Sequence, residues 1–124
     1  MVIQTLPGAF SVCTVPSYTA ADLDAPFSFT AKTDNERSLI CLTENVPQNT
    51  MDRTDGWRGF RIAGVLDFSL IGILAAIAAV LAQAGVEILA VSSYQTDYVF
   101  IKAEKLPCAL AALQSAGYAI EAND

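Results

Sequence analysis

The stretch "DFSLIGILAAIAAVLAQAG", Asp67 to Gly85, decides the fold, because no charged residue follows Asp67 before the stretch ends. It predicts a helix from Leu70 to Ala84. Ser69 can cap its start, Asp67 adds negative charge near the N-terminus, and Gly85 suits a left-handed C-terminal residue. Such a helix is about 22 Å long at the α-helical rise, whereas a bilayer core is ~30 Å thick.

The side chains of this stretch favour a soluble core over a membrane span. Its large residues recur at spacings of three and four, and small residues fill much of the other side. No lysine or arginine flanks either end as an interfacial anchor. We therefore expect a core helix. The large residues are Leu70, Ile73, Leu74, Ile77 and Leu81.

The segments around this helix predict a β-α-β-β-α-β order, the ferredoxin-like unit with both helices on one face of an antiparallel sheet. β-branched and aromatic residues mark the strands, Pro107 suits a first helical turn, and Gly117 ends the second helix. The expected strands are 57–63, 86–94, 97–103 and 118–122, and the second helix lies within 104–117.

The predicted strands are apolar on both faces, so a second layer or a larger sheet is expected to cover them. The first half supplies a candidate, because "SLICLTENVP" (38–47) aligns with "YVFIKAEKLP" (98–107) after a shift of sixty positions. Strands are expected at 9–15 and 27–33, with room for only a short helix between them. We predict a degenerate N-terminal repeat, 1–56, and a complete C-terminal repeat, 57–124, separated by the polar "QNTMDRTDG".

Composition excludes several classes of function. The 124 residues are 53% hydrophobic and 16% charged, with a net charge of −6, which argues against nucleic acid or an anionic membrane as partner. Cys13, Cys41 and Cys108 are widely spaced, so we expect buried free thiols and a reducing cytoplasm rather than disulfides or zinc. The chain has no histidine, recognisable nucleophile or phosphate loop, and no cofactor or metal is expected.

The segment "GVLDFSLIGILAAIAAVLAQAGVEILAVSSYQTDYVFIKAEKL" (64–106) resembles the C-terminal repeat of small tandem ACT-domain proteins. It is similar to the ACT modules of CASTOR-type arginine sensors and of aspartate kinases. The shared pattern is a glycine turn, Leu-Asp-Phe-Ser, a small-residue helix, Ala-Gly, and a strand into Ser-aromatic-x-x-Asp-Tyr. The resemblance implies an α+β fold of two ferredoxin-like repeats and a non-enzymatic regulatory module that binds an amino acid, as a homodimer.

The resemblance also implies where the amino acid binds. The turn into the first helix, 66–70, would offer backbone amides to an α-carboxylate, and Asp97 would contact the amino or side-chain cation. Ser93 would add a hydrogen bond and Tyr94 an apolar wall. The implied ligand-binding residues are Gly64, Leu66, Asp67, Ser69, Leu70, Gly72, Ser93, Tyr94 and Asp97.

Structural roles are open for each of these residues. Asp67 or Ser69 can simply cap the helix, Asp97 can be a turn residue, Tyr94 can pack on a strand, and the glycines can serve the turn. Arg37 stands at the first-half position that matches Asp97, so a second identical site is not expected. The alternative functions are a scaffold for oligomerisation or partner binding without ligand, and, less favoured, an enzyme of unrecognised chemistry.

Overall fold

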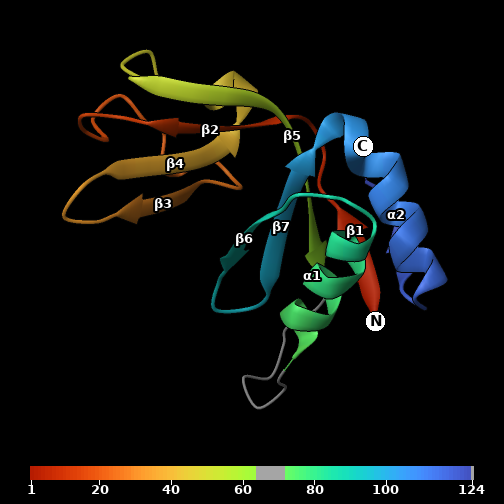
Figure 1. The fold of residues 1–124 in the computed structure, drawn as a ribbon. Coiled ribbons are helices and arrows are strands. Elements are labelled where there is room, and N and C mark those ends of the chain that lie inside the picture. The colour runs from red at the N-terminus through yellow and green to blue at the C-terminus, as the bar shows by residue number, and fades with distance from the viewer. Residues whose placement is uncertain (64–71, 124) are drawn as a thin grey trace. The chain divides into compact units, whose positions relative to one another are not determined.

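The computed structural model describes residues 1–63 and 72–123, and these fall into two compact units (Figure 1). The C-terminal unit consists of residues 1–7 and 58–124, and the N-terminal unit of residues 8–57. The first seven residues, which the sequence prediction assigned to the N-terminal half, therefore belong to the C-terminal unit. The strand β5, Asp52–Ile62, contributes to both units, so the predicted boundary after residue 56 falls inside a strand.

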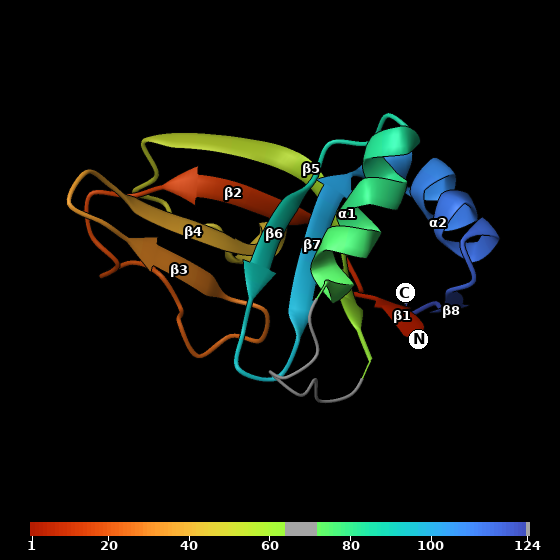
Figure 2. The same cartoon turned by 60° about the horizontal axis from the view of Figure 1, so that its bottom comes forward.

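The C-terminal unit is an α+β sandwich with both helices on one face of its sheet (Figure 2). Its strands lie in the order β6-β7-β5-β1-β8. The predicted β-α-β-β-α-β order is present from β5 onward. The other elements are β1 (Val2–Thr5), α1 (Ile73–Gln83), β6 (Leu89–Ser92), β7 (Asp97–Lys102), the 3₁₀ turn η2 (Ala103–Lys105), α2 (Leu106–Ser115) and β8 (Ala119–Glu121).

The strand β1 was not predicted, and it changes the sheet from antiparallel to mixed. β1 lies between β5 and β8; it is antiparallel to β5, with Ile3 opposite Ile62, and parallel to β8, with Ile3 opposite Ile120. The three isoleucines therefore share one face, the face that the helices cover. The expectation of a purely antiparallel sheet was wrong because a distant segment of four residues completes the layer.

Helix α1 begins later than predicted. Gly72 precedes it as the N-cap with a left-handed φ of 80°, which is not a helical conformation, and the predicted start at Leu70 lies outside the described residues. The predicted stop is confirmed, since Gly85 has φ 75° and the Val86 amide donates to the Leu81 carbonyl at 2.9 Å. No helix of the described residues is long and apolar enough to cross a membrane.

The predicted apolar stripe of α1 is confirmed where the structure describes it. Ile77 and Leu81 are fully buried, and Ile73 and Leu74 pack against the same core. Helix α2 contributes Ala109 and Leu113. Fully burying such a side chain contributes roughly 1.5–3 kcal/mol, so this core supplies most of the unit's driving force.

The other face of the C-terminal sheet is apolar only in part. Phe100 and Leu6 are buried there, and a Cβ added to Gly59 would lie 2.8 Å from the Phe100 ring. Further along this face, Arg61 Nε donates to Gln4 Oε1 at 3.0 Å, and Gln4 Nε2 donates to Glu121 Oε1 at 3.0 Å. Over part of β5, β1 and β8, this face is therefore covered by a row of hydrogen-bonded polar side chains, whereas the sequence predicted an apolar second face.

The N-terminal unit is a sheet without an α-helix. It contains β2 (Phe10–Thr14), β3 (Phe29–Lys32), β4 (Arg37–Leu42), the 3₁₀ turn η1 (Thr43–Asn45) and the first half of β5, in the order β3-β4-β2-β5. Turns occupy the segment where a short helix was expected. Residues 52–56, predicted as a polar linker, pair with β2 because strand pairing uses backbone groups that polar residues also carry.

The β3–β4 and β6–β7 hairpins coincide after a shift of sixty positions. Phe29 lies opposite Ile40 just as Leu89 lies opposite Phe100, and Lys32 lies opposite Arg37 just as Ser92 lies opposite Asp97. The 3₁₀ turns η1 and η2 follow β4 and β7 at the same offset. The sequence repeat therefore corresponds to equal strand registers.

The cysteines differ in burial. Cys13 and Cys41 are buried in β2 and β4, as predicted, and burial raises the pKa of the Cys41 thiol to about 11. Burial also raises the pKa of the Cys13 thiol. Cys108, predicted to be buried, is exposed, because it lies on the face of α2 away from Ala109 and Leu113.

We predict that Gly59→Ala lowers the free energy of unfolding by about 1–3 kcal/mol, since the added methyl group overlaps the Phe100 ring. Urea denaturation measures this change. Phe100→Leu removes the ring edge, so the double variant should lose less stability than the sum of the two single variants. Strictly additive losses would contradict the proposed contact.

We predict that one thiol per chain, Cys108, reacts rapidly with a disulfide reagent at pH 8 in the native protein. Cys13 and Cys41 should react only after unfolding, because both are buried and Cys41, with a pKa of about 11, stays protonated at this pH. Thiol counting by absorbance, repeated in denaturant and with Cys108→Ser, checks this. A fast reaction in native Cys108→Ser would contradict it.

Candidate functional site

The predicted site is described in part. Gly64, Leu66, Asp67, Ser69 and Leu70 lie outside the described residues. Gly72, Ser93, Tyr94 and Asp97 are described, at the start of α1 and around the turn that joins β6 to β7.

The turn formed by residues 93–96 is closed by its own hydrogen bonds. The Ser93 amide and the Ser93 hydroxyl each donate to the Thr96 carbonyl at 2.9 Å, and the Thr96 amide donates back to Ser93 Oγ at 3.3 Å. The Ser93 side chain therefore stabilises one conformation of the turn between β6 and β7.

Thr96 attaches this turn to the central strand of the unit. Its side chain is buried, and Oγ1 donates to the carbonyl of Ile62, the last residue of β5, at 2.9 Å. The 93–96 turn therefore lies beside the point at which β5 ends and the connection to α1 begins. Sequence reasoning treated Thr96 only as part of a short connection; a threonine before an aspartate in a turn was the one available signal.

Asp97 lies directly opposite Ser92, and the Ser92 hydroxyl donates to Asp97 Oδ1 at 2.6 Å. Asp97 is half-buried and shares the helix-covered face of β7 with Val99 and Ile101. Within the described part of the chain, no lysine or arginine forms an ion pair with this carboxylate. Asp97 thus presents an oriented negative charge at the end of the sheet where β5 leads toward α1.

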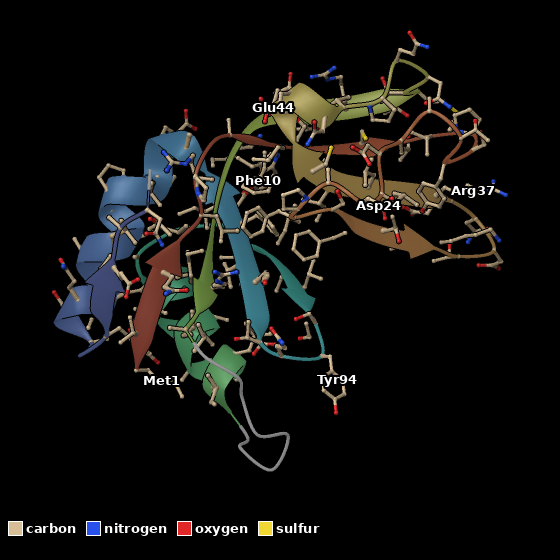
Figure 3. All side chains as sticks on the ribbon, turned by 180° about the vertical axis from the view of Figure 1, so that it is seen from behind. Met1, Phe10, Asp24, Arg37, Glu44 and Tyr94 are labelled. Carbon is tan, nitrogen blue, oxygen red and sulfur yellow. The ribbon has the colours of Figure 1, made fainter. Side chains whose placement is uncertain are left out.

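Tyr94 and Gly72 differ in their surroundings. The Tyr94 side chain is 82% exposed and points away from the sheet in Figure 3. Gly72, as the N-cap of α1, has no side chain that could accept a hydrogen bond from the first helical amides. The first amide that finds a helical acceptor is that of Ala76, which donates to the Gly72 carbonyl at 2.8 Å. The positive end of the helix dipole at the start of α1 can therefore face an anion.

A pocket of about 420 Å³ lies at the other end of β7 from Asp97. Two glutamates and two lysines surround it, so it does not coincide with the predicted site. Its lining residues are Gly85, Glu87, Lys102, Glu104 and Lys105. No group of three metal-ligating side chains occurs among residues 1–63 and 72–123.

The N-terminal unit contains a polar cluster that sequence reasoning did not find. Ser11 of β2 is buried opposite a bulge in β5, and its hydroxyl donates to Asp55 Oδ1 at 2.5 Å and lies 2.9 Å from Thr43 Oγ1. Hydrogen bonds from Ser11 and then Arg53 lower the pKa of the Asp55 carboxyl. This cluster satisfies a buried hydroxyl, and its groups bond one another, which gives it a structural role.

Several solved structures share the fold. A protein from Agobacterium tumefaciens is 23% identical, with a TM-score of 0.85 over 99% of this chain and 93% of its own. A protein from Vibrio cholerae is 21% identical, with a TM-score of 0.71 over 90% and 85% of the two chains. The regulatory subunit of aspartate kinase from Thermus thermophilus is 14% identical, with a TM-score of 0.64 over 93% and 97%. No curated protein sequence matches this chain.

The sequence profile of the ACT domain matches residues 52–115, from the start of β5 to the end of α2. This match covers more than half of the chain, and the resemblance to the ACT modules of aspartate kinases is confirmed by it and by the shared fold. The chain belongs to the ACT domain family.

Proposed function

We propose that this protein is a non-enzymatic regulatory module that binds an amino acid in its C-terminal unit, between the start of α1 and the 93–96 turn. The observation that carries the proposal is the hydrogen bond from Thr96 to the Ile62 carbonyl, which holds Asp97 beside the end of β5. The structural relatives support a regulatory role, since one of them is the regulatory subunit of an aspartate kinase.

The two ends of an amino acid match two features of this region. The α-carboxylate suits the N-terminal end of α1, whose cap is Gly72 and where the helix dipole is positive. The ammonium suits the Asp97 carboxylate, because Ser92 occupies one oxygen and leaves the other for a charge-assisted hydrogen bond. We propose that Asp67, Ser69 and their neighbours Gly64, Leu66 and Leu70 complete the site, with Ser93 fixing the turn and Tyr94 near its rim.

We further propose that the N-terminal unit is a degenerate, helix-free copy of the C-terminal unit. Equal strand registers in the two hairpins and the equal positions of η1 and η2 support this interpretation. We also propose a cytoplasmic location, supported by three free cysteines, which suit a reducing compartment, and a homodimer, as the family resemblance implies.

The second candidate function is an assembly module without ligand. It is favoured by β6, which pairs with β7 and with no other strand of the described residues. Edge strands offer unpaired backbone groups to another chain.

We predict that a subset of the twenty amino acids raises the melting temperature of the protein, because a ligand that binds only the native state adds about 2.7 kcal/mol at a hundredfold excess over Kd. Asp97→Asn should lower the affinity for that amino acid about 10–100-fold, as expected for losing a charged hydrogen bond of roughly 1.5–3 kcal/mol. Differential scanning fluorimetry followed by calorimetric titration provides both values.

The matched control is Asp24→Asn, which removes an exposed carboxylate from the N-terminal unit and should leave binding unchanged. If no amino acid shifts the melting temperature, or if Asp97→Asn binds as well as the unchanged protein, the proposed site is wrong. In that case, a dimer mass measured by light scattering after size exclusion would favour the assembly module.

We predict that Thr96→Val destabilises the protein by about 1–3 kcal/mol, since the buried Ile62 carbonyl loses its hydrogen-bond donor. The same change should weaken amino-acid binding, because the 93–96 turn is no longer bonded to β5. Thr96→Ser retains the hydroxyl and should recover most of both losses. Urea denaturation and titration of the best amino acid give the two readouts. A Thr96→Val variant with unchanged affinity would show that the anchor does not position Asp97.

A further inference from the structure

An open pocket of about 290 Å³ lies within the N-terminal unit, around the turn formed by residues 33–36. This volume is close to the lower end of the range for small-molecule sites. Residues of three segments surround it, the end of β2, the β3–β4 turn and the start of β5. They include Val15, Lys32, Asp34, Glu36, Arg37 and Met51.

The 33–36 turn has the backbone bonding of the 93–96 turn. The Thr33 amide donates to the Glu36 carbonyl at 2.9 Å, and Thr33 Oγ1 accepts from the amides of Asn35 and Glu36 at 3.1 and 3.2 Å. The Thr33 side chain thus closes the 33–36 turn as the Ser93 side chain closes the 93–96 turn. The pocket therefore occupies the place, relative to its hairpin, that the proposed amino-acid site occupies in the C-terminal unit.

The charge at this place is inverted. Lys32 and Arg37 lie directly opposite each other, where the other hairpin has Ser92 and Asp97 (Figure 3 labels Arg37 at the closed end of its hairpin). Like charges directly opposite in a strand pair destabilise it unless an opposite charge lies between them. A bound anion would supply that charge.

The carboxylates of the turn, Asp34 and Glu36, line the same pocket without forming an ion pair with these two cations. Glu36 accepts a hydrogen bond from the Ser38 hydroxyl, and within residues 8–57 neither Asp34 nor Glu36 forms an ion pair with Lys32 or Arg37. Arg37 uses one of its five N–H donors for the Pro16 carbonyl, at 3.2 Å, which fixes its guanidinium at the pocket. The remaining donors suit a planar carboxylate, which a guanidinium binds through two parallel bonds.

We propose that this pocket binds a small organic carboxylate, with Lys32 and Arg37 holding the carboxylate and Val15 and Met51 contacting an apolar portion. Val15 is buried, whereas Met51 is 61% exposed, so the flexible Met51 side chain is accessible to a ligand. The site is independent of the proposed amino-acid site, because all of its residues belong to the N-terminal unit.

The test uses the full chain, labelled with ¹⁵N, and 4-methylpentanoate as the probe at low salt. We expect the probe to shift the amide resonances of 33–37, and Lys32→Gln and Arg37→Gln each to weaken binding at least fivefold. Lys105→Gln, which removes an exposed cation from the C-terminal unit, and Asp97→Asn should bind the probe unchanged. Without probe, Lys32→Gln should raise the melting temperature by about 1–4 °C, because it relieves the repulsion.

Two comparison ligands make the test specific. The neutral 4-methylpentanamide has the same apolar group and should not bind, and inorganic phosphate should bind less tightly than the carboxylate because it lacks the apolar group. The proposal is overturned if the probe shifts none of these resonances, if the amide or phosphate binds equally well, or if Lys32→Gln leaves binding intact.

Discussion

The pairing of β5 is the constraint on which the rest of the structure depends. Its first half pairs with β2, and its second half pairs with β1 and β7. An interior strand must satisfy backbone groups on both edges, so its register fixes that of its neighbours. Alternation then sends Phe60 and Ile62 to the helix-covered core and Gly59 and Arg61 to the other face. Gly59 makes room for the Phe100 ring, and the Ile62 carbonyl anchors Thr96.

Two hairpins with one backbone geometry carry different chemistry. Each turn is closed by a hydroxyl side chain, Ser93 or Thr33, and each places a pair of residues opposite each other at the base of the turn. That pair is Ser92 and Asp97 in one unit, and Lys32 and Arg37 in the other. Because the turns are closed by their own bonds, a change of charge in the pair alters the electrostatic field without altering the loop.

Periodicity predicted the elements that bury side chains. The stripe of α1, the strands β7 and β4, and the stops at Gly85 and Gly117 follow from hydrophobic spacing and left-handed glycines. The sequence could not reveal β1, because four residues give too short a pattern and its partners lie about sixty and 120 positions away. Residues 52–56 were missed for a related reason, since they join the sheet through the backbone while their side chains stay exposed.

The candidate site stays a prediction, and only part of its geometry follows from the sequence. The family resemblance of the Ser-aromatic-x-x-Asp motif indicated Asp97, which lies beside the end of β5 in the structure. The role of Thr96 could not be predicted, because it depends on a tertiary hydrogen bond to Ile62 that no local pattern encodes. The start of α1 also escaped prediction, because Gly72 could equally have continued a helix of small residues.

The two units differ in how they can supply positive charge to an anion. The C-terminal unit has α1, whose N-terminal end at Gly72 carries the positive end of the helix dipole, which can face an anion without a cationic side chain. Residues 8–57 contain no α-helix, so no helix end can serve this purpose in the N-terminal unit. Lys32 and Arg37 supply the positive charge instead, at the same place relative to their turn. Asp97 thus occurs in the unit that has α-helices and Arg37 in the unit that has none, which links the local charge to the architecture of each unit.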